Sequence, residues 1–245
     1  MLTILSVPCY SSSIKSLLSV VQQWIFQNKK TYICVTNVYV VVESQRNNAF
    51  LRILQTSGMN VADGMPLVWI GKMLGYSQIE RAYGPMLMKR ICGISEQQGY
   101  KIFLYGTTTS TLSLLIQKLK QQFPKLIIVG SFAPPFRSLS KKENKEVFNK
   151  INASGAHVVF VGIGTPKQEI WMYQARKKLQ ANILIGVGAA FDFIAGTKKQ
   201  APRWMQQIGL EWLFRMAQEP RRLWKRYLIN NILFCYYCFR LLISK

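Results

Sequence analysis

Two aspartates, Asp63 and Asp192, are the side chains of this sequence best suited to acid–base chemistry. Each lies among small residues, in Val-Ala-Asp63-Gly-Met-Pro and in Gly-Ala-Ala-Phe-Asp192-Phe. The other eight acidic residues are glutamates, set against 32 lysines and arginines. General bases and metal ligands are often carboxylates, and a chain with so few of them offers few candidates for either role. Aspartates placed for solubility would be more numerous and would follow runs of charge, so these two come first.

Glycine-rich turns follow three predicted strands and could hold a phosphate. In residues 158–169, VVFVGIGTPKQE, a buried strand runs into Gly162-x-Gly164 and then into a helix. Residues 185–196, IGVGAAFDFIAG, repeat this design, and Gly106 closes a third strand. Ligands of open α/β sheets bind at such strand ends, where glycine lets the backbone approach a phosphate. An ordinary turn with a helix cap is the alternative for the first of these segments.

The sequence contains no pattern typical of a metal site. It has no HExxH, no Asp-x-Asp and no cluster of cysteine and histidine, so no metal is predicted. The five cysteines are odd in number and scattered. They argue against a disulfide framework and for a reducing compartment.

Apolar strand patterns alternate with amphipathic helical patterns from about residue 30 to residue 195. Buried strands in this alternation indicate an α/β fold with a mostly parallel sheet covered on both faces. The predicted strands are Tyr32–Thr36, Lys101–Tyr105, Leu126–Val129, Val158–Val161 and Ile183–Val187. The predicted helices are Ser11–Asn28, Val40–Gln55, Met86–Gln98, Thr111–Gln122, Lys141–Ala153 and Glu169–Leu179.

The character of the chain changes after Gly196, so we divide it into a catalytic domain, 1–196, and an appendage, 197–245. Residues 198–245 hold ten lysines and arginines against two glutamates. The pattern predicts basic amphipathic helices interrupted at Pro220. Their aromatic residues, combined with cationic ones, favour a membrane interface. Tyr227–Ile243 carries Arg240 and two asparagines and does not predict a membrane-spanning helix.

The net charge of +22 calls for a polyanionic partner. Nucleic acid, an anionic membrane and phosphorylated ligands all fit this charge. A nucleic-acid-binding protein is therefore one alternative, although no recognised nucleic-acid-binding pattern accompanies the charge. A nucleotide-dependent dehydrogenase is another, but the GxGxxG fingerprint and its ribose-binding acid are missing.

Four motifs in a fixed order resemble those of the WecG/TagA/CpsF glycosyltransferase family. The resemblance runs from about Thr31 to Tyr227. The motifs are Asp63-Gly64-Met-Pro, Gly164-Thr-Pro-Lys-Gln168-Glu169, Gly188-Ala-Ala-Phe-Asp192-Phe, and Leu210-Glu211-Trp212-Leu-Phe-Arg215 followed by Glu219-Pro220-Arg221-Arg222.

The resemblance implies a Rossmann-like sheet of the GT-E type with a C-terminal helical appendage that touches the membrane. It implies an inverting enzyme that moves N-acetylmannosamine, its uronic acid or glucose from a UDP-sugar to a polyprenyl-diphosphate-linked saccharide. Such an enzyme makes cell-surface or extracellular polysaccharide, including teichoic acid-like polymers. It needs no metal or cofactor besides its UDP-sugar substrate. We therefore expect a cytoplasmic protein on the inner face of the membrane, with an anionic lipid surface and no nucleic acid as partner. Assembly into a homo-oligomer is left open.

The resemblance also implies roles by position. Asp63 is expected to be the general base, and Arg81 to help bind or activate the diphosphate. The predicted donor site comprises Thr36, Asn37, Gly64, Gly106, Gly164, Gln168, Glu169, Gly188 and Asp192, with Asp192 shaping a turn. The arginines expected at the acceptor and the membrane are Arg203, Arg215, Arg221, Arg222 and Arg226.

Three positions depart from the family pattern. Met86 stands where an aspartate is common, and Tyr39 stands where histidine is frequent. Gln200 replaces the arginine of an Arg-Ala-Pro sequence, although Arg203 follows. A polar contact near Met86 is therefore not expected.

Overall fold

A computed structural model of the chain describes residues 2–243. The chain forms two compact units, each built from segments that are distant in the sequence. The first unit comprises Met1–Ile14, Val35–Tyr83 and Lys199–Lys245, and the second comprises Lys15–Cys34 and Gly84–Lys198. The predicted division of function between 1–196 and 197–245 stays a prediction.

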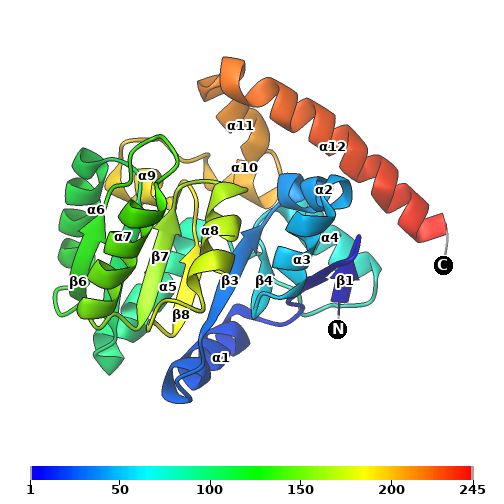
Figure 1. The fold of residues 1–245 in the computed structure, drawn as a ribbon. Coiled ribbons are helices and arrows are strands. Elements are labelled where there is room, and N and C mark those ends of the chain that lie inside the picture. The colour runs from blue at the N-terminus through cyan, green and yellow to red at the C-terminus, as the bar shows by residue number, and fades with distance from the viewer. Residues whose placement is uncertain (1, 244–245) are drawn as a thin grey trace. The chain divides into compact units, whose positions relative to one another are not determined.

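A six-stranded sheet carries the strand order β4-β3-β8-β7-β5-β6 (Figure 1). The pairs β3–β8, β8–β7, β7–β5 and β5–β6 are all parallel, which confirms the predicted mostly parallel α/β sheet. Side chains on both faces of β3 and β8 are buried, which explains why these strands are continuous apolar runs. The strands are β3 (Thr31–Thr36), β4 (Met59–Ala62), β5 (Lys101–Gly106), β6 (Ile127–Phe132), β7 (Val158–Gly162) and β8 (Ile183–Gly186).

Apart from the short helix over Ala190–Ala195, which was not predicted, the helices of the second unit fall close to the stretches that the hydrophobic periodicity predicts. Helix α7 spans the predicted residues, and its start is fixed by a capping box in which Ser140 and Glu143 bond each other's backbone. Helix α9 packs against α5 and α6. The helices that belong wholly or mainly to this unit are α1 (Ile14–Phe26), α5 (Gly84–Gln98), α6 (Thr109–Gln122), α7 (Lys141–Ala153), α8 (Lys167–Ala175) and α9 (Ala190–Ala195).

The first unit contains elements that the sequence did not reveal. An antiparallel hairpin of β1 (Leu2–Ile4) and β2 (Val7–Cys9) packs beside β4 and α4 (Met65–Met73). The single helix predicted over Val40–Gln55 is wrong, because it is two helices, α2 (Val38–Arg46) and α3 (Asn48–Gln55). Asn47 separates them: its N–H closes α2 on Glu43, and its side chain caps α3 by accepting from Phe50.

The appendage consists of α10 (Arg203–Gln207), α11 (Glu211–Gln218) and α12 (Pro220–Ile243). The break before Pro220 is confirmed. Helix α12 packs along α2 and also contacts α11 (Figure 1). Its outer face leaves apolar side chains exposed, among them Trp224, Ile232 and Phe239. Among residues 2–243, no helix is both long enough and apolar enough to cross a membrane.

Candidate active site

Asp63 lies directly after β4 and two residues before α4. Its main-chain N–H donates to the carbonyl oxygen of Thr36 at 2.8 Å, so the ends of β3 and β4 are tied together. Gly64 is the N-cap of α4, and Pro66 presets the first turn of that helix. The Asp63 side chain is partly exposed, yet the surrounding atoms leave its carboxyl poorly hydrated. A half-buried carboxylate at a strand end is well placed to meet a substrate.

Asn37, which follows the last residue of β3, contacts Asp63. Its side chain caps α2 by accepting from the N–H of Val40 at 3.2 Å. The same side chain forms a hydrogen bond with Asp63 that favours the ionised carboxylate. Thr36, the preceding residue, is fully buried. The structure therefore places Thr36, Asn37, Asp63 and Gly64 in one group at the ends of β3 and β4.

Arg81 is held by protein acceptors on two sides. Its Nε donates to the main-chain carbonyl oxygen of Asp63, and a terminal nitrogen forms an ion pair with Glu211 of α11. The side chains of Arg81 and Glu211 are only 14% and 19% exposed. The guanidinium also lies over the ring of Tyr83, 4.5 Å from its centroid. Arg81 thus lies beside Asp63, with its guanidinium engaged inside the protein, and its expected role at the diphosphate stays a prediction.

The electrostatic surroundings raise the pKa of Asp63 to about 6. Burial is the largest cause, and the negative charge of Glu211 adds to it. The positive charges of Arg81 and Arg215 and the bond from Asn37 act in the opposite direction. A carboxylate with this pKa is mostly ionised at pH 7 and is a stronger base than an ordinary aspartate.

The predicted appendage arginines occupy three different settings. Arg215 of α11 acts electrostatically on Asp63. Arg226 of α12 lies over the ring of Tyr39, 3.9 Å from its centroid, and burial lowers the pKa of its guanidinium. Arg222 pairs with Glu219 near the surface at 2.5 Å. Arg203 and Arg221 are also exposed.

Gln168, Glu169 and Gly188 of the predicted donor site meet in the second unit. The N–H of Gly188 donates to Oε1 of Gln168 at 3.0 Å, and Nε2 of Gln168 donates to Oε1 of Glu169 at 2.9 Å. Thr165 donates to the same Glu169 oxygen at 3.1 Å. Gln168 and Glu169 are 2% and 0% exposed. These side chains therefore hold the two glycine-rich turns together, with Gly164 in the turn before α8.

Gly106 and Asp192 form a second link in this unit. Gly106 has φ +143°, and a Cβ there would lie 2.5 Å from the carbonyl oxygen of Gly162, so only glycine fits. The next residue, Thr107, donates its hydroxyl to Oδ1 of Asp192 at 3.3 Å. Asp192 lies in the first turn of α9 and connects that helix to the end of β5.

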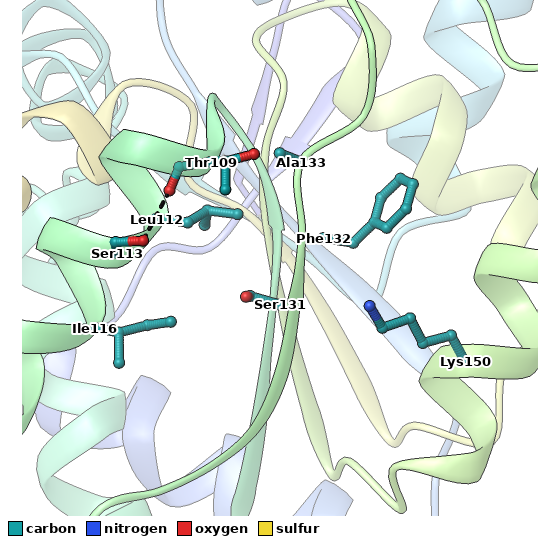
Figure 2. Close-up of a pocket in the computed structure, with 8 residues that line it drawn as sticks. All are labelled: Thr109, Leu112, Ser113, Ile116, Ser131, Phe132, Ala133 and Lys150. Carbon is teal, nitrogen blue, oxygen red and sulfur yellow. Dashed lines mark hydrogen bonds between the residues drawn. The ribbon is translucent and has the colours of Figure 1, made fainter.

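A pocket of about 290 Å³ lies between α6, β6 and α7 in the second unit (Figure 2). Lys150 extends from α7 toward Phe132, with Nζ 5.7 Å from the ring centroid. No predicted site residue lines it, and no sequence motif marked it. Its lining residues are Thr109, Leu112, Ser113, Ile116, Ser131, Phe132, Ala133 and Lys150.

Glu211 and Gln206 are partners of Arg81 that the sequence did not reveal. Gln206 is buried and lies 3.4–3.5 Å from an Arg81 nitrogen through its carbonyl oxygen and its side chain. Glu211 stands within a quoted motif, but it is 130 residues from Arg81 and no local pattern links the two. Within residues 2–243, no three histidine, cysteine, aspartate or glutamate side chains gather as metal ligands.

Comparisons with known proteins agree on one family. Residues 2–245 match the family described as "Glycosyl transferase WecG/TagA/CpsF family". The chain is similar to an N-acetylglucosaminyldiphosphoundecaprenol N-acetyl-beta-D-mannosaminyltransferase of Bacillus spizizenii, with 29% identity over 202 residues, 82% of this chain and 76% of the relative. A protein of the same name from Bacillus subtilis is 26% identical over 227 residues, 92% of this chain and 86% of that relative.

Proposed function

The chain belongs to the WecG/TagA/CpsF family of glycosyltransferases, and we propose that it transfers N-acetylmannosamine from a UDP-sugar to N-acetylglucosaminyl-diphospho-polyprenol. The acceptor and the transferred sugar are proposed from the names of the two relatives. The observation that supports the chemistry is the group around Asp63, where burial raises the carboxyl pKa to about 6. The expected product is an early lipid-linked intermediate of a cell-surface polymer of the teichoic acid type.

In the proposed reaction Asp63 accepts the proton of the acceptor hydroxyl. The acceptor oxygen forms a bond to the anomeric carbon while the bond from that carbon to the diphosphate oxygen breaks. UDP leaves with the electron pair of the broken bond, and the configuration at the anomeric carbon inverts. A positioned general base contributes about 10²–10⁴-fold to such a rate.

Negative charge that develops on the departing diphosphate requires positive or N–H partners. The positive charge of Arg215, on α11, lowers the pKa of Asp63. We propose that it stabilises the diphosphate during transfer. Main-chain N–H groups of the turns at Gly164 and Gly188 are proposed to hold the donor, in keeping with their glycine-rich sequences.

The appendage is proposed to bind the membrane that carries the lipid acceptor. Helix α12 combines exposed apolar side chains with arginines and a lysine. Each basic residue near an anionic leaflet contributes about 1 kcal/mol of binding. This arrangement supports peripheral attachment to the inner face of the cell membrane from the cytoplasm.

A product assay tests the proposal. The full chain is incubated with a synthetic polyprenyl-diphosphate N-acetylglucosamine and each of several UDP-sugars, and UDP release and the lipid product are followed. We expect a disaccharide product with UDP-N-acetylmannosamine, and its loss in Asp63→Asn. Transfer from only UDP-glucose or the uronic acid donor would contradict the proposed sugar. No transfer from any UDP-sugar, with a thermal shift on NAD or nucleic acid instead, would overturn the function.

A further inference from the structure

A glutamate of the appendage is joined to the proposed base through one arginine. Glu211, the first residue of α11, pairs with Arg81, and Nε of Arg81 donates to the main-chain oxygen of Asp63. Both members of the ion pair are largely shielded from water. The proposed reaction has no step for Glu211, so this largely shielded carboxylate needs another explanation.

The geometry gives Arg81 little freedom. Its guanidinium is fixed at Nε by Asp63 and at a terminal nitrogen by Glu211, while Tyr83 covers one face. A guanidinium fixed at two of its nitrogens has a defined orientation. If Glu211 loses its charge, Arg81 is left as a largely buried cation with no carboxylate partner. It would then turn toward the nearest anion, and the Asp63 carboxylate is beside it.

We propose that Glu211 is a positioning residue for the transfer reaction, which holds Arg81 on the main chain of Asp63 and keeps it from pairing with the Asp63 carboxylate. The inference rests on the proposed role of Asp63 as the base. Glu211 touches no reacting atom and acts through Arg81. Through this contact the appendage affects the protonation of Asp63, in addition to its proposed binding of the membrane that carries the acceptor.

The charges around Asp63 support the same arrangement. Glu211 raises the pKa of Asp63, whereas Arg81 and Arg215 lower it, and the Asn37 side chain lowers it through a hydrogen bond. Tyr227 of α12 also interacts electrostatically with Asp63. Replacing Glu211 with glutamine removes one raising charge and leaves Arg81 uncompensated. Both changes shift the Asp63 pKa downward, which makes the carboxylate a weaker base.

The presence of only two aspartates allows a direct measurement. Protein labelled with ¹³C at the aspartate carboxyl carbon gives two NMR signals, and Asp192→Asn assigns the Asp63 signal. We expect the Asp63 carboxyl to titrate near pH 6 in the unsubstituted chain and at lower pH in Glu211→Gln. Glu80→Gln is the matched control, because Glu80 precedes Arg81 in the sequence but binds the N–H of Ile14 instead. The control should leave the Asp63 titration unchanged.

Kinetics then tests whether Glu211 acts through Arg81. Glu211→Gln is expected to lower kcat by about 10–100-fold, as a small misplacement of a reacting group does, with little change in the donor KM. The acid limb of the rate profile should move to lower pH. Adding Arg81→Lys to Glu211→Gln should cost little more than either substitution alone, because both remove the same contact.

Two outcomes would overturn the inference. One is an unchanged Asp63 titration in a folded Glu211→Gln protein. The other is additive losses in the double variant, which would mean that the two residues act separately. If Glu211→Gln fails to fold, Glu211→Asp takes its place: its shorter side chain no longer reaches Arg81, so the Asp63 titration should move to lower pH and kcat should fall, and an unchanged titration would again overturn the inference. The titration needs no substrate, so its result is independent of whether the proposed transfer occurs.

Discussion

The main-chain N–H of Asp63 donates a 2.8 Å hydrogen bond to the carbonyl oxygen of Thr36. This bond joins the residue after β4 to the last residue of β3. Asn37 follows Thr36, caps α2 and also bonds the Asp63 side chain. The carboxylate is therefore held both through its backbone and by a helix cap, so it loses little freedom when an acceptor binds.

Asp63→Asn should abolish most transfer while leaving the fold intact. Asparagine keeps the size and the hydrogen bonds of the site but accepts no proton at neutral pH. We expect kcat to fall by about 10²–10⁴-fold. Initial rates with saturating donor and acceptor measure the effect, and circular dichroism checks the fold. A variant with more than a tenth of the original rate would exclude Asp63 as the base.

The same substitution should change how stability depends on pH. The folded-state pKa of Asp63 is raised to about 6 from its ordinary value of 3.8. The folded protein therefore binds a proton at Asp63 more tightly than the unfolded chain does, and this protonation stabilises the fold. The stabilisation is complete below pH 4 and is lost as pH rises through 6. Relative to that of the unsubstituted chain, the free energy of unfolding of Asp63→Asn should therefore rise by up to about 3 kcal/mol between pH 4 and pH 7. Urea unfolding at both pH values measures this; an equal difference at both would contradict the raised pKa.

The central strands of the main sheet were predictable because they are buried on both faces. Runs such as Val158–Val161 and Ile183–Val187 are apolar at every position, and only a covered parallel sheet suits them. Strand β4 escaped prediction because it is four residues long and contains Asn60. The side-chain NH2 group of Asn60 donates to the carbonyl oxygens of Pro8 and Leu54, which are partners that no local pattern reveals.

The site was predictable only in part, for a similar reason. The family resemblance marked Asp63 and Arg81 as site residues, and the structure places them together. The ion pair between Arg81 and Glu211 depends on the return of the chain after 130 residues. A sequence pattern records neighbours along an element, so contacts between distant segments need the fold itself. The break at Asn47 was missed because a capping asparagine also occurs within helices as an ordinary polar residue.

Gly106→Ala should destabilise the second unit far more than Gly164→Ala. The new Cβ at position 106 would lie 2.5 Å from a main-chain oxygen that cannot move without disturbing β7. At Gly164 the φ is +80° but nothing lies within 4 Å, so only backbone strain is added. We expect the free energy of unfolding to fall by about 1–2 kcal/mol in Gly164→Ala and by more in Gly106→Ala. Chemical denaturation gives both values, and equal losses would refute the predicted clash.

Tyr39→Ala should loosen α12 from α2. The Arg226 guanidinium lies over the Tyr39 ring at 3.9 Å, and a partly desolvated pair of this kind contributes about 1–2 kcal/mol. Limited trypsin digestion should then cut α12 at its basic residues faster. Tyr39→Phe keeps the ring and serves as the control. Unchanged cleavage in Tyr39→Ala would show that the packing of α12 does not depend on this contact.

The apolar face of α12 should determine membrane binding. Ile232 and Phe239 are 69% and 64% exposed, and inserting such a side chain into an apolar environment gains about 1.5–3 kcal/mol. Ile232→Ser combined with Phe239→Ser should therefore lower co-sedimentation with anionic vesicles more than tenfold. Phe26→Ser is the control, because Phe26 is 84% exposed on α1, away from the appendage in sequence. Raising the salt concentration should weaken the remaining binding, since screening shortens the reach of the basic residues. Equal losses in the control, or salt-independent binding to neutral vesicles, would argue that α12 is not the surface that meets the membrane.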